Sequence, residues 1–320
     1  MTKIERIILN SSPFRFLSEK SKHIVLPGFD RVPLYDVIVF FLAQVRKVGL
    51  LERASAISYN FIMAIPPTCL FLFTLIPQLP FIKKKAIIRQ LHGVIQDMIP
   101  AEQYNKNIIS FVDSFMSNAR IGLLSFGFIL LIFFASNGMM GLMRSFNKNY
   151  IGFEKRTNLQ TRWTAIKLTV YIMGLVVGCL LLLMMQGNVL TWMGIQRVTL
   201  IKIIKTVRWF LIVALVFYAN AFIYKYAPAI KKRWKLFSPG SLLATFLSFL
   251  ASLTFSAYLN NFGKYNALYG SIGTVIVLMT LIYINSLVLL IGYELNVSIH
   301  SLKAMADERE RHEHKSPEVG

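Results

Sequence analysis

Long uninterrupted apolar stretches dominate the chain and set the expectation for its fold. A helix needs about 20 residues to cross the hydrocarbon core of a bilayer. Six stretches approach or exceed that length, at residues 54–79, 121–143, 163–186, 206–227, 241–259 and 271–298. Their apolar residues are consecutive, whereas the strands of a membrane β-barrel alternate apolar and polar positions. The pattern therefore predicts an all-α, polytopic membrane protein with six transmembrane helices.

Two connecting regions repeat apolar residues at helical spacing beside polar ones. In the first, residues 34–48, the apolar positions are Val37, Ile38, Phe41, Val45 and Val48. This region is predicted to form an amphipathic helix at the membrane interface. In the second, residues 80–120, Pro100 separates two such stripes. We expect a helical hairpin there, which either lies on the membrane surface or dips into the bundle.

Composition and charge agree with a membrane protein and narrow its partners. Of the 320 residues, 55% are hydrophobic and 16% are charged, against about 25% charged in soluble domains. The formal net charge of +20 indicates an anionic partner, either nucleic acid or anionic lipid. The Lys and Arg residues are spread over connections that face membrane surfaces, so we expect an anionic phospholipid or glycolipid and no nucleic acid.

The distribution of Lys and Arg also predicts the orientation of the chain. Connections on the side that holds both termini carry 22 of these residues, and the opposite connections carry 10. Cytoplasmic loops are the ones enriched in Lys and Arg, and the charged N-terminus lacks the apolar core of a secretory signal. We therefore expect a cytoplasmic segment at 1–35, a membrane domain at 36–300 and a polar cytoplasmic tail at 301–320.

Few residues are placed for metal or covalent chemistry. Cys69 and Cys179 lie within apolar stretches and are expected to be buried. His312 and His314 lie in the polar tail, for which a disordered, solvated segment is expected. Phosphate-loop, nucleophile-elbow and zinc-protease motifs are absent from the sequence. The sequence thus predicts no catalytic residue, no metal site and no cofactor.

Charged residues in or beside the predicted spans are candidates for function, because charge is unfavourable in lipid. The predicted topology brings five to the cytoplasmic mouth of the bundle: Arg53, Arg144, Lys167, Lys225 and Glu294. Glu294 lies near the C-terminal end of the last span, where the helix dipole disfavours a carboxylate. We expect Arg53 to pair with Glu294 and to close the first helix on the last. The alternative is that these side chains snorkel to the interface.

Uncharged polar residues, prolines and glycines complete the set of candidates. The first span carries Ser55, Ser58, Tyr59, Pro66 and Pro67. Its prolines are expected to kink the helix, and a kinked, polar-faced helix suits either close packing or a lined cavity. Substrate or gating roles are also expected for Asn137 and Asn285, and close helix packing for Gly270 and Gly273.

Three stretches resemble the YihY/BrkB family of bacterial inner-membrane proteins. They are RASAISYNFIMAIPPTCLFLFTLIPQLP, GLMRSFNKNYIGFEKR and YGSIGTVIVLMTLIYINSLVLLIGYELN, and the resemblance covers about residues 36–300. Its most specific parts include the closing motif Gly292-x-Glu294-x-Asn296. The resemblance implies a multi-pass protein of the bacterial inner membrane, and some members of the family are linked to serum resistance and envelope lipid handling.

Three functional hypotheses follow. The first is a transporter or flippase-like protein that handles an anionic lipid or another envelope amphiphile through the basic mouth. The second is a non-transporting scaffold for envelope assembly. The third is a ribonuclease, as implied by the label ribonuclease BN that many members carry; the scattered histidines and the acids of the polar tail give it no support. The oligomeric state is left open.

Overall fold

The computed structural model describes residues 19–315 with internal gaps. The gaps are residues 31, 48, 69–70, 72–88, 90–91, 93–105, 107–108, 111–112, 114–120, 147–155, 185–197, 231–232 and 262–264. The helical hairpin expected at 80–120 falls almost entirely on these gaps and stays a prediction. So does the burial of Cys69, whereas Cys179 is half-buried.

The described chain consists of helices and short connections, which confirms the all-α prediction. The main helices are α3 (Leu34–Lys47), α4 (Leu50–Ile62), α8 (Ile121–Phe146), α9 (Asn158–Met184), α11 (Val198–Tyr226), α12 (Pro239–Asn261) and α13 (Tyr265–Lys315). Five of them, α8, α9, α11, α12 and α13, contain stretches that are long and apolar enough to cross a membrane. Five of the six predicted spans therefore have a helix of the required length.

The first predicted span begins as a short helix that breaks before its prolines. Helix α4 has 13 residues, and Met63 and Ala64 form a turn before residues 65–68 become helical again. A proline at position 66 has no N–H to donate to the carbonyl of Ile62, the last residue of α4. The expected kink is thus a full interruption. Residues 69–70 and 72–79 lie outside the description, so the spanning length of the first predicted span stays a prediction.

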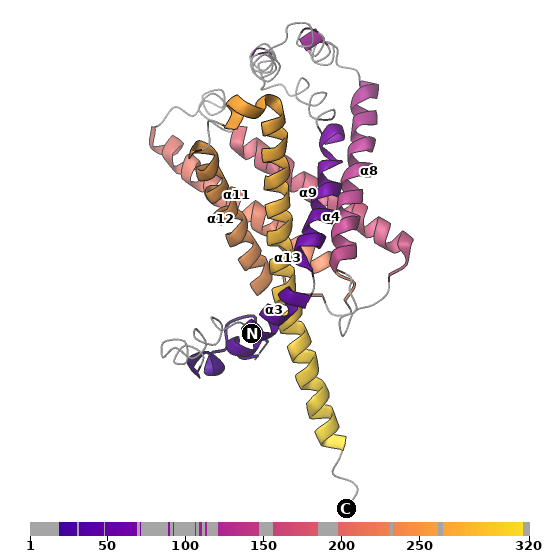
Figure 1. Cartoon of the computed structure of the whole chain (residues 1–320), viewed down its shortest axis with the longest axis vertical. Coiled ribbons are helices and arrows are strands. Elements are labelled where there is room, and N and C mark those ends of the chain that lie inside the picture. Colours follow the sequence, from indigo (N-terminus) through magenta and orange to yellow (C-terminus); the bar gives the residue numbers. More distant parts are fainter. Residues whose placement is uncertain are drawn as a thin grey trace, which may run out of the picture.

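The C-terminal tail is helical over residues 301–315, where a disordered segment was expected. Helix α13 is 51 residues long and continues to Lys315, and in Figure 1 it projects well beyond the other helices. The tail alternates acids and bases at a spacing of four, as in Asp307–Arg311 and Glu308–His312. Pairs with the acid on the N-terminal side stabilise a helix, and this local contribution outweighs the polarity of the segment.

The helices pack in a closed ring that follows their order along the chain. Helix α4 contacts α8, α8 contacts α9, α9 contacts α11, α11 contacts α12, α12 contacts α13, and α13 returns to α4. We call one end of this ring the terminal end: α8 and α11 finish there, α9 and α12 begin there, and α3 lies there beside α13 (Figure 1). The sequence predicts that this end faces the cytoplasm.

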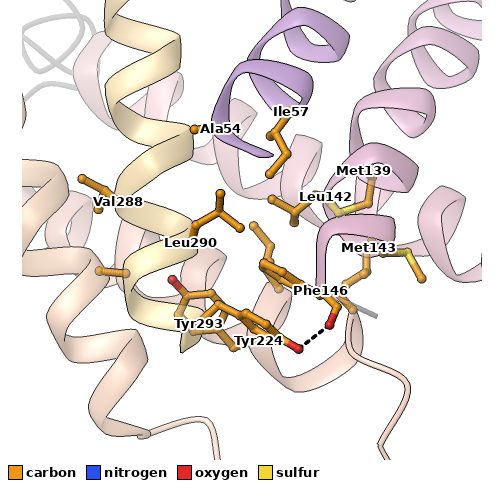
Figure 2. Packing of buried hydrophobic residues seen from close by; sticks show 14 of the residues in the cluster. Ala54, Ile57, Met139, Leu142, Met143, Phe146, Tyr224, Val288, Leu290 and Tyr293 are labelled. Carbon is orange, nitrogen blue, oxygen red and sulfur yellow. Dashed lines mark hydrogen bonds between the residues drawn. The ribbon is translucent and has the colours of Figure 1, made fainter. Parts of the chain in front are cut away.

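The hydrophobic core lies toward the terminal end of the ring. Its fully buried members include Ile57 of α4, Leu142 of α8 and Leu290 of α13, and Figure 2 shows their side chains converging. A second, smaller cluster joins Phe29, Val32 and Val37 to Ile299. Through it, the segment before α3 and α3 itself are held against α13. The predicted amphipathic helix is therefore confirmed as a helix, and its place at a membrane interface stays a prediction.

Helices α12 and α13 cross with their backbones in contact at two glycines. A Cβ atom built on Gly240 would collide with the carbonyl oxygen of Gly292. A Cβ atom on Gly292 would lie 2.5 Å from the Tyr224 hydroxyl and 2.6 Å from the Gly240 carbonyl oxygen. Small residues permit such close crossings in membrane bundles. The closing motif therefore begins with a glycine because no larger residue fits.

We predict that Gly292→Ala destabilises the protein, because overpacking of a close-packed site costs about 1–3 kcal/mol. The matched control is Gly174→Ala, since nothing lies within 4 Å of a Cβ added to Gly174. Thermal unfolding of the purified protein in detergent should show a lower midpoint for Gly292→Ala alone. Equal midpoints for the two variants would contradict the close crossing.

Candidate functional site

One turn of α13 carries the closing motif and directs each of its residues to a different neighbour. Successive residues of an α-helix are about 100° apart around its axis. Gly292 and Asn296 therefore share the face toward α12, while Glu294 lies on the opposite side and meets Arg53 of α4. Tyr293 lies between them and contacts Phe146 of α8. A single helical turn thus holds three other helices in place.

Arg53 and Glu294 form a buried ion pair, as the sequence predicts. The Arg53 guanidinium nitrogen lies 2.6 Å from a Glu294 carboxylate oxygen, and the exposed fractions of the two side chains are 8% and 0%. Because both groups are buried, the alternative of snorkelling side chains is wrong for this pair. A second Arg53 nitrogen donates to the backbone carbonyl of Ser145, near the end of α8. The pair therefore connects α4, α8 and α13.

One hydrogen-bond donor of Arg53 is left without an acceptor among the described residues. Its Nε atom is buried and has no partner among the described residues. A buried donor without an acceptor is unfavourable by about 1–3 kcal/mol, so native structures retain one where a water, an ion or a function accounts for it. The Nε–H group is therefore the one donor of Arg53 for which the described residues supply no acceptor.

The hydroxyl groups of two tyrosines near the ion pair donate hydrogen bonds to backbone carbonyls. The Tyr293 hydroxyl donates to the carbonyl of Phe146 over 2.6 Å, as the dashed line in Figure 2 marks. Phe146 ends α8, and the last carbonyls of a helix lack partners within it. The two rings also stack, with centroids 3.8 Å apart. The Tyr224 hydroxyl donates to the Leu289 carbonyl over 2.7 Å, which fixes α11 on α13.

Asn296 completes the motif by capping α12. Its side-chain oxygen accepts the Gly240 N–H over 2.8 Å, and its nitrogen donates to the Ser238 hydroxyl over 2.9 Å. Gly240 is the second residue of α12, so this bond satisfies one of the N–H groups that a helix start leaves without a partner. The Asn296 side-chain amide of α13 therefore fixes the start of α12.

The predicted rim of four cations around Glu294 is not formed. Arg144 and Lys167 are exposed, and Lys225 lies over the ring of Tyr226, 5.5 Å from its centroid. Arg144 turns outward because Leu142, Met143 and Phe146 occupy the inner face of α8. Of the four predicted cations, the described structure brings Arg53 alone to Glu294.

The uncharged candidates are mostly satisfied within their own helices. Ser58 is buried and donates to the carbonyl of Ser55, which is exposed, as is Tyr59. Asn285 donates to the carbonyl of Leu281, four residues earlier in α13. These short-range bonds remove the need for a partner on another helix.

The remaining candidates have separate surroundings. Asn137 is half-buried and accepts a hydrogen bond from Arg162 of α9. Pro66 is exposed and Pro67 is buried, both beyond the break in α4. Gly270 and Gly273 lie in α13, and their predicted close packing falls outside the described contacts.

Arg156 has a structural role that the sequence analysis missed. Its guanidinium donates over 3.0 Å to the carbonyls of Ala227 and Pro228, and over 3.4 Å to that of Tyr226. These carbonyls end α11, where a cation is favourable. Arg156 and Tyr226 are 70 positions apart in the chain, so a pattern of local spacing has no means of pairing them. The described residues contain no group of three or more His, Cys, Asp or Glu placed to hold a metal ion.

We predict that removing either partner of the ion pair destabilises the protein. Arg53→Gln and Glu294→Gln should each lower the free energy of unfolding by about 3–5 kcal/mol, because each leaves a buried charge unpaired. The charge swap Arg53→Glu with Glu294→Arg should regain part of the loss. Unfolding in detergent, followed by intrinsic fluorescence, measures all three. A swapped protein no more stable than either single variant would contradict the pairing.

A second prediction concerns the cap of α12. Asn296→Leu should lower the free energy of unfolding by about 1–3 kcal/mol, since it leaves a buried backbone N–H without an acceptor. Asn285→Leu is the control, because its amide donates only to a carbonyl of its own helix. Comparable stability of the two variants in the same unfolding assay would argue against a capping role.

Comparison with known proteins agrees with this architecture. The family described as Virulence factor BrkB matches residues 41–318. A Bacillus subtilis relative named as ribonuclease-like protein YfkH is 31% identical over 82% of this chain and 94% of its own length. A UPF0761 membrane protein of Haemophilus influenzae is 23% identical over 82% of this chain and 95% of its own length. No solved structure matches. The chain therefore belongs to the BrkB family and is a multi-pass integral membrane protein.

Proposed function

We propose that the protein transports an anionic amphiphile, such as a phospholipid or glycolipid of the envelope, across the bacterial inner membrane. In this proposal both termini face the cytoplasm and the terminal end of the ring admits the substrate. The single observation that carries the proposal is the buried Arg53–Glu294 pair beside the interrupted helix α4. Ionisable residues buried in a membrane bundle mark substrate or ion pathways.

The break in α4 supports this choice over a purely structural role. Transporters build their substrate sites from discontinuous helices, whose freed backbone groups and helix ends face the substrate. Here the break lies ten residues after Arg53, between Ile62 and the prolines. In this proposal the first half of α4 moves relative to the segment beyond the break. The ion pair and the core contacts of Ile57 hold this half in the closed position.

The chemistry of Arg53 indicates how an anion would act. Arg53 already donates to Glu294 and to the Ser145 carbonyl, and its Nε–H has no described acceptor. A phosphate or carboxylate oxygen can accept from that N–H and compete with Glu294 for the guanidinium. The exposed cations Arg144 and Lys167 at the same end attract such a headgroup. Entry of the anionic headgroup and separation of Arg53 from Glu294 then occur together.

The test is transport by the full chain in phosphatidylcholine vesicles. Two trace lipids, a fluorescent phosphatidylglycerol and a matched fluorescent phosphatidylcholine, report transbilayer movement through quenching of the outer leaflet. The wild-type protein should accelerate movement of the anionic lipid above that of the neutral one. The double variant Arg53→Gln with Glu294→Gln, which leaves no unpaired charge, should stay folded and lose this acceleration.

Other outcomes favour the other hypotheses. Absence of lipid movement by folded wild-type protein, with capture of envelope partners, would favour the scaffold. Cleavage of tRNA that a chelator abolishes would favour the ribonuclease, to which the name of the Bacillus subtilis relative alludes. Equal transport by the wild type and the double variant would remove the ion pair from the mechanism.

A further inference from the structure

A cavity of about 440 Å³ opens at the terminal end, outside the ion-pair site. Three parts of the chain form its wall: the turn at residues 28–30, the connection that leads into α12, and the stretch of α13 from Asn296 to Asp307. Neither the closing ion pair nor the exposed cations Arg144 and Lys167 line it. Its volume is within the range of about 300–1,000 Å³ that is usual for ligand sites.

Basic and aromatic side chains line this cavity. Arg233, Trp234 and Lys235 come from the connection before α12, and His300 and Lys303 come from α13. Trp234 contributes an aromatic surface to the lining. A ligand that carries negative charge suits this lining, because cationic side chains make strong hydrogen bonds to anions.

Two acids, Asp30 and Asp307, also line the cavity and limit its charge. Asp30 lies 3.5 Å from Lys303, and both side chains are substantially exposed. Apart from His300, three cations face two carboxylates, so these side chains keep a surplus of one positive charge. Arg233 lies over the ring of Tyr226, 5.1 Å from its centroid.

An apolar track leads away from the cavity along α12. Its first residue is Phe237, a lining residue of the cavity that is 66% exposed. The track continues on one face of α12 through Leu242, Phe246, Leu250 and Leu253, which are 47–69% exposed. These residues follow the spacing of a helix surface and belong to a stretch that is long and apolar enough to span a membrane. A headgroup in the cavity thus has a surface for its acyl chain directly beside it.

We propose that this cavity binds the phosphate-bearing headgroup of an anionic phospholipid, with an acyl chain along the exposed face of α12. Arg233 and Lys235 supply the charge, Trp234 supplies an aromatic wall, and the position at the start of α12 sets the depth of the headgroup. The site stands on its own contacts and requires no transport. Its wall also touches the ion-pair turn, because Trp234 packs against Tyr293 with ring centroids 5.6 Å apart.

The test measures lipid binding to the purified full chain in detergent by native mass spectrometry. The probes are phosphatidylglycerol, phosphatidylcholine and inorganic phosphate. We expect phosphatidylglycerol to bind more tightly than phosphatidylcholine. Arg233→Gln with Lys235→Gln should weaken phosphatidylglycerol binding roughly 30-fold, as expected for the loss of two cations that face anionic lipid. The control, Lys20→Gln with Lys47→Gln, removes the same charge from exposed positions outside the cavity lining.

A variant that is expected to strengthen binding separates loss of the site from misfolding, because a misfolded protein would not bind more tightly. Asp30→Asn removes a lining acid, releases Lys303, and keeps a residue type that tolerates the positive φ of 49° at this position. It should strengthen phosphatidylglycerol binding. Equal binding of phosphatidylcholine, an equal loss in both double variants, or full displacement by millimolar inorganic phosphate would each overturn the proposal. Failure of vesicle transport with intact lipid binding would count against the proposed transport and leave this site standing.

Discussion

A carboxylate buried in an apolar bundle is stable only while a cation faces it, and Glu294 imposes this requirement on the whole structure. The desolvation of two charges is unfavourable by several kcal/mol, and a close pair with further hydrogen bonds is needed to offset it. Arg53 meets this requirement through the 2.6 Å contact and its bond to Ser145. Because the two residues lie 241 positions apart, satisfying one charge joins the first helix of the ring to the last.

The turn of α13 that carries Glu294 also makes the contacts that fix α8 and α12. Gly292 admits the backbone of α12, Tyr293 satisfies the end of α8, and Asn296 satisfies the start of α12. Each contact removes an unpaired polar group or a steric obstacle at a position that is buried from solvent. This concentration explains why the buried core lies toward one end of the ring, around residues 288–297 of α13.

Both proposed anion sites lie along α13, on either side of its crossing with α12. The ion pair joins the first turns of α4 to α13, and the cavity lies beside the projecting part of α13. Trp234 and Tyr293 connect the two through stacked and tilted rings, and Tyr293 also contacts α8. The two proposed sites therefore share one structural element, the turn of α13 that carries Tyr293 and Glu294.

The sequence by itself determined the fold class, the positions and order of five long helices, and the Arg53–Glu294 pair. Long apolar runs and an isolated acid near a helix end are local signals, and in a bilayer few structures satisfy them. Tertiary structure alone decided that Arg144 and Lys167 turn away from Glu294, that Arg156 caps α11, and that a cavity forms around Trp234. These outcomes depend on the rotation of each helix about its axis, which is fixed by packing between residues far apart in the chain. The helical tail is a different case, because the spacing of its acids and bases in the sequence is itself compatible with a helix.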